Sequence, residues 1–321
     1  MYTACVFLIF SVVLVNSRNL PYKELTEKTS FQLLDPLVDR KWQIQNTHFE
    51  NFPECSNQKI TYHIKSHYFT GFKRRENIRT TWGQGKNLVF LCFSKNTNNQ
   101  TLPPDSNSKD MLITDDYPES TDFFSVKIAL GVFHASKCNS HAVFTDDDVY
   151  FFIDDFEKMI SKNWNFENTV AMRGKFHRKE PPVRNSNSHW KKYLQSYEDY
   201  PFDLYPDFAH GAGYAASYLA IKKMAETLPY TRVLRHVDDV YFGLLGSDAK
   251  VVKENDDNFS TALEHVTGDD TYPCGLYNLH GINHIEKFIE IKNEQCRKWG
   301  KKRFKVTNWR ELQDPTVDNF E

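Results

Sequence analysis

The chain has 321 residues, 40% of them hydrophobic and 15% aromatic, which is enough to bury a large core in one or two domains. Its formal net charge of −2 and pI of about 6.6 exclude the strongly basic surface that nucleic-acid binding needs. We therefore expect a globular protein without a nucleic-acid partner.

The N-terminus carries an apolar run from Thr3 to Val15 that is interrupted only by Ser11. This run is short for a membrane span and typical of the core of a secretory signal. We predict that residues 1–17 are a signal peptide or, if uncleaved, a short anchor that associates the protein with a membrane. In both cases the rest of the chain enters the secretory pathway.

Residues 18–55 are polar and lack a sustained hydrophobic period, so we predict a stem there and a globular domain over residues 56–321. An odd number of cysteines follows the apolar run, so at least one must stay unpaired. Cys92 lies in an apolar segment and is expected to be a small buried residue. Cys274 and Cys296 are close enough in sequence to form a disulfide.

Strand and helix signals alternate in the first half of this domain. Residues 59–64 alternate like a strand, and residues 87–93 form an apolar, strand-like run. Helical spacing follows over residues 120–137, with a capping residue at its start, and again over residues 152–160. The pattern predicts an α/β sheet whose strand ends carry the ligand site.

Three consecutive aspartates, Asp146, Asp147 and Asp148, separate the apolar segment 141–145 from the apolar segment 149–153. Carboxylates at positions i and i+2 that leave a strand end can hold a hard divalent ion and keep coordination positions open for phosphate oxygens. Asp pairs also occur elsewhere in the chain, so a solvated turn is the alternative interpretation.

Several short motifs occur together in a fixed order. They are Arg74–Trp82 with its Ile-Arg-Thr-Thr-Trp ending, Phe144–Tyr150, Pro182–Arg184 with Trp190–Tyr193, Tyr205-Pro206 with Gly211–Tyr214, and Val237–Gly243. From about residue 55 to about residue 290 the chain resembles the β-1,3-glycosyltransferases of the galactosyltransferase and fringe-like family, glycosyltransferase family 31. The resemblance implies a single-domain GT-A type α/β fold with a mixed, mostly parallel central sheet.

The resemblance also implies a division of roles among the acidic residues. Asp148 would be the direct metal ligand, and Asp146 would lie nearer the nucleotide ribose, with Asp147 in the same cofactor-binding motif. The expected ion is Mn²⁺, with Mg²⁺ as the chemical alternative. Asp239 would be the base that deprotonates the acceptor hydroxyl, and the residue before it is Asp238 where the family has Glu. The structural alternative for both is the start of a helix.

Other candidate residues have two interpretations each. His280 would complete the metal site or have a purely structural role. Arg74, Arg75 and Arg79 would contact the diphosphate or form buried ion pairs, with the structural role favoured for Arg79. Gly211 and Gly213 would let the backbone approach the donor sugar or simply form turns. Trp190 and Tyr214 are candidates for stacking on a sugar or for the core.

The resemblance implies that the protein is an inverting β-1,3-hexosyltransferase, which transfers galactose from UDP-galactose to a glycan acceptor on a glycoprotein or glycolipid. The same family includes enzymes that use UDP-GlcNAc, which is the alternative donor. A Golgi location with a type II anchor, or secretion after cleavage, accompanies this function.

Two alternatives come from other classes of protein. A phosphatase of the haloacid dehalogenase type would use Asp146 and Asp148 as nucleophile and acid, although its nucleophile normally opens the domain. A non-catalytic lumenal binder of glycans or nucleotide sugars would keep the fold without the chemistry.

Overall fold

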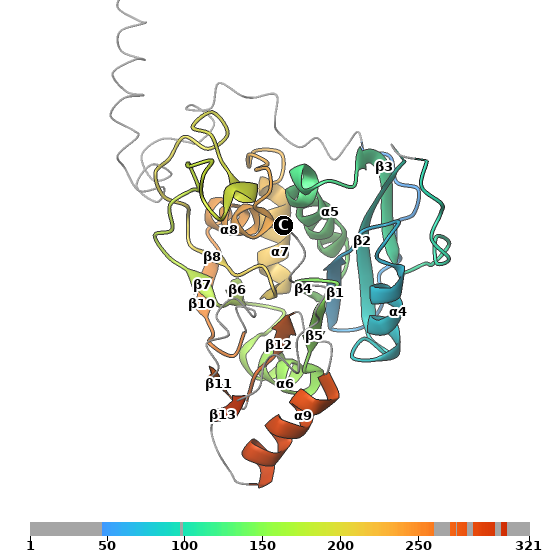
Figure 1. Cartoon of the computed structure of the whole chain (residues 1–321), viewed down its shortest axis with the longest axis vertical. Coiled ribbons are helices and arrows are strands. Elements are labelled where there is room, and N and C mark those ends of the chain that lie inside the picture. Colours follow the sequence, from blue (N-terminus) through green and yellow to red (C-terminus); the bar gives the residue numbers. More distant parts are fainter. Residues whose placement is uncertain are drawn as a thin grey trace, which may run out of the picture.

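The protein is described here from a computed structural model that covers residues 47–96, 99–259, 270–273, 275–280, 285–298 and 303–306. Its main sheet consists of β1 (Ile60–Lys65), β2 (Asn87–Lys95), β3 (Met111–Pro118), β4 (His141–Asp146), β6 (Ala171–Gly174), β9 (Tyr214–Ala216) and β10 (Val252–Asn255). The strands lie in the order β10-β6-β9-β4-β1-β2-β3 (Figure 1).

Most neighbouring strands of this sheet are parallel. β1 pairs in parallel with β2 and β4, β2 with β3, and β6 with β10, whereas β9 is antiparallel to both β4 and β6. This arrangement confirms the predicted mixed, mostly parallel sheet. Because the parallel strands end at one edge, their carboxyl ends are the expected place for a ligand site.

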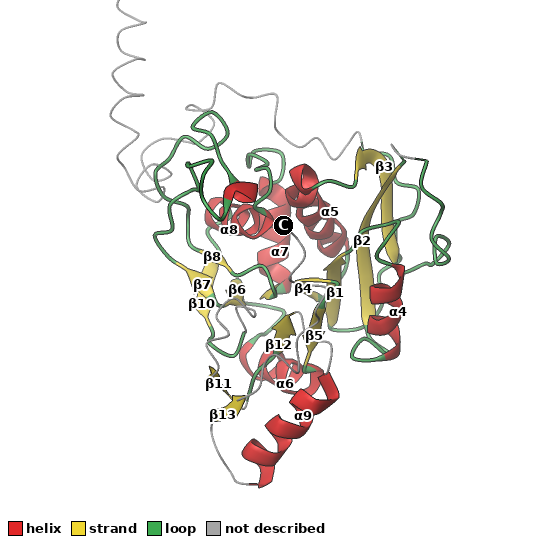
Figure 2. Cartoon of the chain, viewed as in Figure 1, coloured by secondary structure: helices red, strands yellow, loops and turns green. Residues whose placement is uncertain are grey.

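Helices cover both faces of the sheet (Figure 2). One hydrophobic cluster joins the first face to α5 (Phe124–Lys137), α7 (Tyr218–Thr227) and α8 (Asp238–Asp248), and a second joins the other face to α4 (Phe72–Thr80) and α6 (Ile153–Asn163). Side chains of β2 alternate between the clusters, with Leu91 and Phe93 in the first and Phe90 and Cys92 in the second.

The predicted elements are observed with small shifts. The helix expected over residues 120–137 starts with the short 3₁₀ helix η3 (Thr121–Phe123), where the Ser120 side chain accepts a hydrogen bond from the Asp122 amide. The strand expected at residues 59–64 is β1, but all six of its side chains are buried. The alternation therefore does not mark a solvent face, because helices cover both sides of this strand.

Smaller elements complete the described chain. They are β5 (Val149–Phe151), β7 (Phe176–His177), η4 (Lys191–Tyr193), β8 (Phe208–Ala209), β11 (Asp270–Pro273), β12 (Asn278–His280), α9 (Ile285–Asn293), the π-helical turn η5 (Glu294–Lys298) and β13 (Arg303–Val306). Among them, β12 pairs with β5, β7 with β8, and β11 with β13, each antiparallel. The β12–β5 pair brings a late segment of the chain beside the residues that follow the aspartate triplet.

Part of the segment predicted as stem belongs to the folded domain. Phe49 and Phe52 pack against the first hydrophobic cluster, and Asn51 forms a β-bridge with Ile113 of β3. Residues 18–46 of the predicted stem and the predicted signal of residues 1–17 lie outside the described residues. In the described part of the chain, no helix has the length and hydrophobicity required to cross a membrane.

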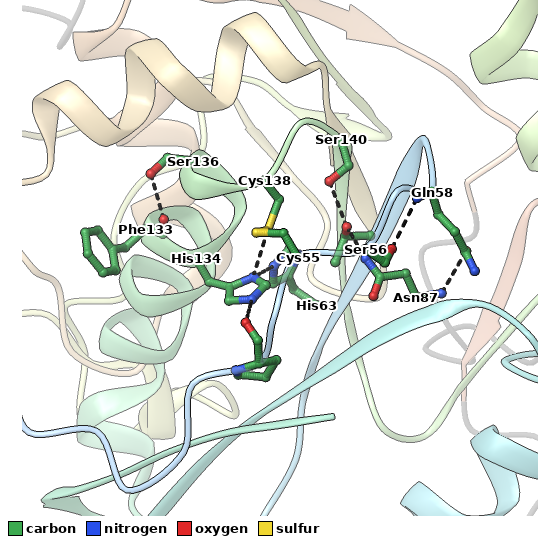
Figure 3. The surroundings of a disulfide bond; sticks show 12 residues. Cys55, Ser56, Gln58, His63, Asn87, Phe133, His134, Ser136, Cys138 and Ser140 are labelled. Carbon is green, nitrogen blue, oxygen red and sulfur yellow. Dashed lines mark hydrogen bonds between the residues drawn. A yellow bond between two sulfur atoms is a disulfide. The ribbon is translucent and has the colours of Figure 1, made fainter. Parts of the chain in front are cut away.

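A disulfide between Cys55 and Cys138 ties this N-terminal segment to the end of α5 (Figure 3). Beside it, His134 lies 3.1 Å from His63 and 3.0 Å from the carbonyl oxygen of Pro53. Burial lowers the pKa of both histidines, so the pair is neutral at physiological pH. The bridge closes a separation of 83 residues, which restricts the unfolded chain strongly.

The remaining cysteine expectations have different outcomes. Cys92 is a free, buried thiol in β2, which confirms the prediction of a small apolar residue. The proposed Cys274–Cys296 pair involves Cys274, which lies outside the described residues.

Replacing Cys55 and Cys138 together by Ala should lower the free energy of unfolding by about 2–5 kcal/mol, because the unfolded chain regains the freedom of a long loop. Urea denaturation of the wild type and of the double variant measures this effect, and the response to dithiothreitol should be smaller in the variant because it lacks the Cys55–Cys138 bridge. Cys92→Ala is the control and should leave the response to the reductant in place. A wild-type midpoint that reductant does not move would contradict this expectation.

Candidate active site at the carboxyl edge of the sheet

The aspartate triplet lies where the sequence predicts it, at the carboxyl end of a central parallel strand. In the register of β1 and β4, Lys65 is the partner of Asp146, so both strands end at the same level. β9 runs the opposite way and pairs Tyr214 with Phe144, which brings the start of β9 to this edge. The edge thus gathers segments from four distant parts of the sequence, the fourth being the start of α8.

Lys65 joins two of these segments. Its ammonium group lies 2.8 Å from a carboxylate oxygen of Asp146 and forms a second ion pair with Asp238 at the start of α8. The Lys65 side chain is only 8% exposed. Although burial opposes its charge, Asp146 and Asp238 hold the pKa of Lys65 well above the usual value. A charged lysine therefore links the triplet to α8.

The three aspartates of the triplet differ in exposure. The Asp147 side chain is 8% exposed; its Oδ2 accepts a hydrogen bond from the Ser66 hydroxyl at 2.7 Å and its Oδ1 one from Arg74 at 3.0 Å. The side chains of Asp146 and Asp148 are 34% and 27% exposed. The outer pair is thus accessible for a ligand, whereas Asp147, predicted to bind the cofactor, holds the turn in place.

Asp239 lies in the first turn of α8, next to Asp238. One of its carboxylate oxygens accepts a hydrogen bond from the Val240 amide at 2.8 Å. Burial and then the charge of Asp238 raise the pKa of Asp239 to about 7. A carboxylate with this pKa can take up and release a proton near neutral pH, as a general base must.

The arginines of the basic cluster have separate roles. Arg74 is 46% exposed and lies 3.8 Å from Asp148, so it borders the accessible side of the triplet. Arg75 is fully buried and binds Asp105 through two nitrogens, at 2.8 and 2.7 Å. Arg79 binds Asp105 and Asp110. The structural interpretation therefore holds for Arg75 and Arg79, and Arg74 alone of the three lies beside the triplet.

The two glycines also differ. A Cβ atom on Gly213 would lie 2.9 Å from the Asn278 amide nitrogen and 3.0 Å from Phe151, so close packing explains this glycine. On Gly211 a Cβ atom would lie 3.6 Å from Asp239 Oδ2, at ordinary contact distance. Gly211 is therefore the glycine that borders the candidate base.

The two candidate stacking residues separate in the same way. Tyr214 is fully buried, with its ring centroid 4.4 Å from that of Phe242, so it belongs to the core. Trp190 is 39% exposed, at the start of η4. Only Trp190 is open to a ligand.

The donor chemistry of the triplet fits a hard divalent cation, because Asp146 and Asp148 offer carboxylate oxygens. Among the described side chains, no group of three or more His, Cys, Asp or Glu residues could hold a metal ion by itself. The register of β12 and β5 pairs His280 with Val149, directly after the triplet. The prediction for the His280 side chain concerns a group outside the described part of the structure.

Sequence reasoning missed Lys65 and Ser66. Both follow the apolar run of β1, and a polar residue at the end of a buried parallel strand is a recognisable signal for a site at that edge. Their partners are distant in sequence, however, with Asp238 173 residues from Lys65. Only the folded chain shows which acids they meet.

Comparison with known proteins gives a consistent result. A model of the galactosyltransferase family matches residues 73–257, which is more than half of the chain. The chain is 27% identical over 210 residues to lactosylceramide 1,3-N-acetyl-beta-D-glucosaminyltransferase A of Danio rerio, an alignment that covers 59% of this chain and 54% of that protein. It is 26% identical, over the same shares, to the Homo sapiens lactosylceramide 1,3-N-acetyl-beta-D-glucosaminyltransferase.

A third relative is named for a different activity. The chain is 24% identical over 235 residues to the beta-1,3-galactosyltransferase brn of Drosophila melanogaster, which covers 70% of both proteins. The chain spans about half the length of the Danio rerio and Homo sapiens relatives.

Replacing Lys65 by Met should lower the free energy of unfolding by about 3–5 kcal/mol, because Asp146 and Asp238 lose their buried countercharge. Adding Asp238→Asn to this variant should restore part of the loss, since one uncompensated carboxylate disappears. Urea denaturation of the single and double variants measures the coupling. Purely additive changes in the free energy of unfolding would show that Lys65 and Asp238 do not stabilise each other. Lys65→Arg is the charge-conserving control.

Proposed function

Since the chain belongs to the galactosyltransferase family, we propose that it is an inverting β-1,3-hexosyltransferase that moves a sugar from a UDP-sugar to a hydroxyl of a glycan acceptor. The observation that carries the proposal is the placement of two acidic groups on either side of Lys65. The triplet offers carboxylates for the diphosphate side, and Asp239, next to Asp238, offers a base with a pKa near neutrality. This placement supports transfer and gives no support to the phosphatase alternative.

The proposed reaction is a single displacement. Asp239 removes the proton from the acceptor hydroxyl as its oxygen bonds to the anomeric carbon of the donor sugar. The bond from that carbon to the diphosphate oxygen breaks, and UDP leaves with the electron pair. Attack opposite the leaving group inverts the anomeric carbon. The chain's task is to hold both reactants in line and to keep Asp239 deprotonated when the acceptor binds.

Asp148 and Asp146 are the residues proposed to hold a divalent cation, Mn²⁺ or Mg²⁺. Such an ion, when bound, neutralises the charge that develops on the diphosphate leaving group. Arg74 lies beside Asp147 and Asp148 and is 46% exposed, so its guanidinium can reach diphosphate oxygens at the same place.

We propose UDP-galactose as the donor, with UDP-GlcNAc as the competing candidate. The names of the relatives include both a galactosyltransferase and N-acetylglucosaminyltransferases, so they support the two donors alike. Donor choice depends on a few pocket contacts. UDP release by the purified protein with each UDP-sugar, in the presence of Mn²⁺ and a panel of glycosides, separates them.

We also propose that the protein works in the Golgi lumen, held by residues 1–17 as a type II anchor, or secreted after their cleavage. The disulfide between Cys55 and Cys138 supports an oxidising compartment, because such bonds are rare in reducing ones.

Asp239→Asn should reduce transfer by a factor of roughly 10² or more, because the amide cannot accept the acceptor proton. Binding of UDP-sugar should be largely retained. Initial rates of transfer and calorimetric titration with UDP measure the two effects. Asp154→Asn, which changes an acid in the first turn of α6, is the matched control. Unchanged function in Asp239→Asn would favour the non-catalytic binder instead.

The pH dependence of kcat/KM should report the same group. Since Asp239 acts when deprotonated and its pKa is about 7, kcat/KM should fall about tenfold per pH unit as the pH drops below that value. A profile of initial rates between pH 5 and pH 9 with subsaturating acceptor tests this. A flat profile over that range would exclude Asp239 as the base.

Asp148→Ala should weaken metal-dependent UDP binding and transfer by about tenfold or more, since one of the proposed ligands is lost. Titration with UDP in Mn²⁺ and in EDTA measures the metal-dependent part. If both binding and turnover survive the substitution intact, the metal assignment is wrong.

A further inference from the structure

The Tyr205 hydroxyl is buried and forms no hydrogen bond within the described part of the protein. The side chain is 8% exposed, and its hydroxyl has no hydrogen-bond partner among the described residues. The ring is held by Tyr200, at a centroid distance of 4.9 Å, and by Phe208, at 5.9 Å. A buried hydroxyl without a partner is unfavourable for folding, so the Tyr205 hydroxyl has an unused bonding capacity that a ligand reaching it would satisfy.

This hydroxyl lies on the side of the candidate base. Tyr205 packs in one hydrophobic cluster with Val237 and Val240, the residues on either side of the two aspartates at the start of α8. Burial raises the pKa of Tyr205, and the charge of Asp239 raises it further. Burial also raises the pKa of Tyr193, to which Asp239 contributes in the same direction. Tyr193 packs against the same cluster, so both phenol rings adjoin the residues that flank the two aspartates of α8.

An aromatic surface continues from this cluster to solvent. Tyr193 packs against the cluster, and the ring of Trp190 lies 6.1 Å from that of Tyr193 at an interplanar angle of 31°. Trp190 is 39% exposed. Tyr197 is also exposed, but the guanidinium of Arg184 lies 4.0 Å over its ring and covers that face. The ammonium group of Lys192 lies 4.9 Å from the centroid of the Tyr193 ring. The open surface thus consists of Trp190 and the part of Tyr193 that Lys192 leaves uncovered.

The segment that carries this surface is held in place before any ligand binds. Arg184 donates hydrogen bonds to the carbonyl oxygens of Gln195 and Ser196, both at 2.7 Å, and to those of Tyr200 and Phe202. The Gln195 side chain donates to the carbonyl oxygen of Arg235 at 2.7 Å, close to the start of α8. A ligand therefore finds an ordered surface, which reduces the entropic cost of binding.

We propose that Trp190, Tyr193 and Tyr205 form the subsite for the acceptor glycan, an inference that rests on the proposed transferase function. The C–H face of a pyranose stacks on the aromatic rings, and the Tyr205 hydroxyl bonds a sugar hydroxyl. The subsite serves the acceptor because it lies on the Asp239 side of Lys65, whereas the triplet serves the diphosphate. Tyr193 packs against the cluster that contains Val237 and Val240, and Trp190 continues the surface beyond Tyr193, which suits an acceptor of two or more sugars.

Tyr205→Phe is the sharpest test, because it removes only the unused hydroxyl. The KM for a glycan acceptor should rise about fivefold, as expected for one lost hydrogen bond, while the KM for the UDP-sugar changes less than twofold. Thermal stability should stay the same or increase. Tyr241→Phe is the matched control, since its hydroxyl is equally buried and without a partner among the described residues but lies in the core cluster. An unchanged acceptor KM in Tyr205→Phe would overturn the proposal.

Trp190→Ala should raise the acceptor KM about tenfold, and Trp190→Phe should recover part of the loss. Tyr230→Ala is the control for an exposed aromatic residue. Tyr230 is 56% exposed and adjoins Thr231, which binds Asp248 at the far end of α8. If Trp190→Ala changes the oligomeric state in size-exclusion chromatography and leaves the acceptor KM alone, the surface serves a second protein copy and the proposal fails.

A binding measurement separates this inference from the proposed function. Saturation-transfer NMR with lactose, N-acetyllactosamine and methyl β-D-N-acetylglucosaminide detects glycan binding without turnover. Weaker binding in Tyr205→Phe, together with no UDP release by the wild type from any UDP-sugar, would support the subsite and reject the transferase. UDP release by the wild type without binding of any of these three sugars would support the transferase and reject the subsite.

Discussion

The buried ammonium group of Lys65 is the interaction on which the active-site region depends. Lys65 is the last residue of β1. Its ammonium group pairs with Asp146 at the end of β4 and with Asp238 at the start of α8. Charges that leave water need a partner, so the two carboxylates depend on Lys65 for their countercharge and Lys65 depends on them for its own. The ion pairs therefore fix the position of α8 relative to the sheet edge.

A second set of polar contacts, centred on Arg75, holds the turn that follows β1. Arg75 is fully buried, and it donates hydrogen bonds to Ser66, to the carbonyl oxygens of His67 and Tyr68, and to Asp105. The Ser66 hydroxyl in turn bonds Asp147. The middle aspartate is thus held through the turn after β1, whereas Asp146 and Asp148 are the more exposed members of the triplet. Arginine suits this position because its planar fork can satisfy several acceptors at once.

In the proposed function, the same arrangement separates two chemical tasks. On one side of Lys65 the outer aspartates and Arg74 present groups suited to a diphosphate and its cation, and on the other Asp239 keeps a raised pKa beside the buried Asp238. Crowding like charges is unfavourable for stability, and such strain is typical of sites where a proton must move near neutral pH. In the proposed subsite, the aromatic residues packed beside the start of α8 provide the apolar surface for the acceptor.

The α/β class, the positions of the central strands and the family could be predicted from the sequence. Hydrophobic runs and helical spacing are local properties, and the order of the motifs is readable in the chain, as the match to the galactosyltransferase model confirms. Which residues meet became clear in the folded domain alone. It placed Lys65 between two acids, assigned Arg79 to Asp110 instead of to the triplet, buried Tyr214 and left Trp190 exposed. These outcomes depend on contacts between residues far apart in the chain, and packing and ion pairing select those contacts only when the whole domain folds.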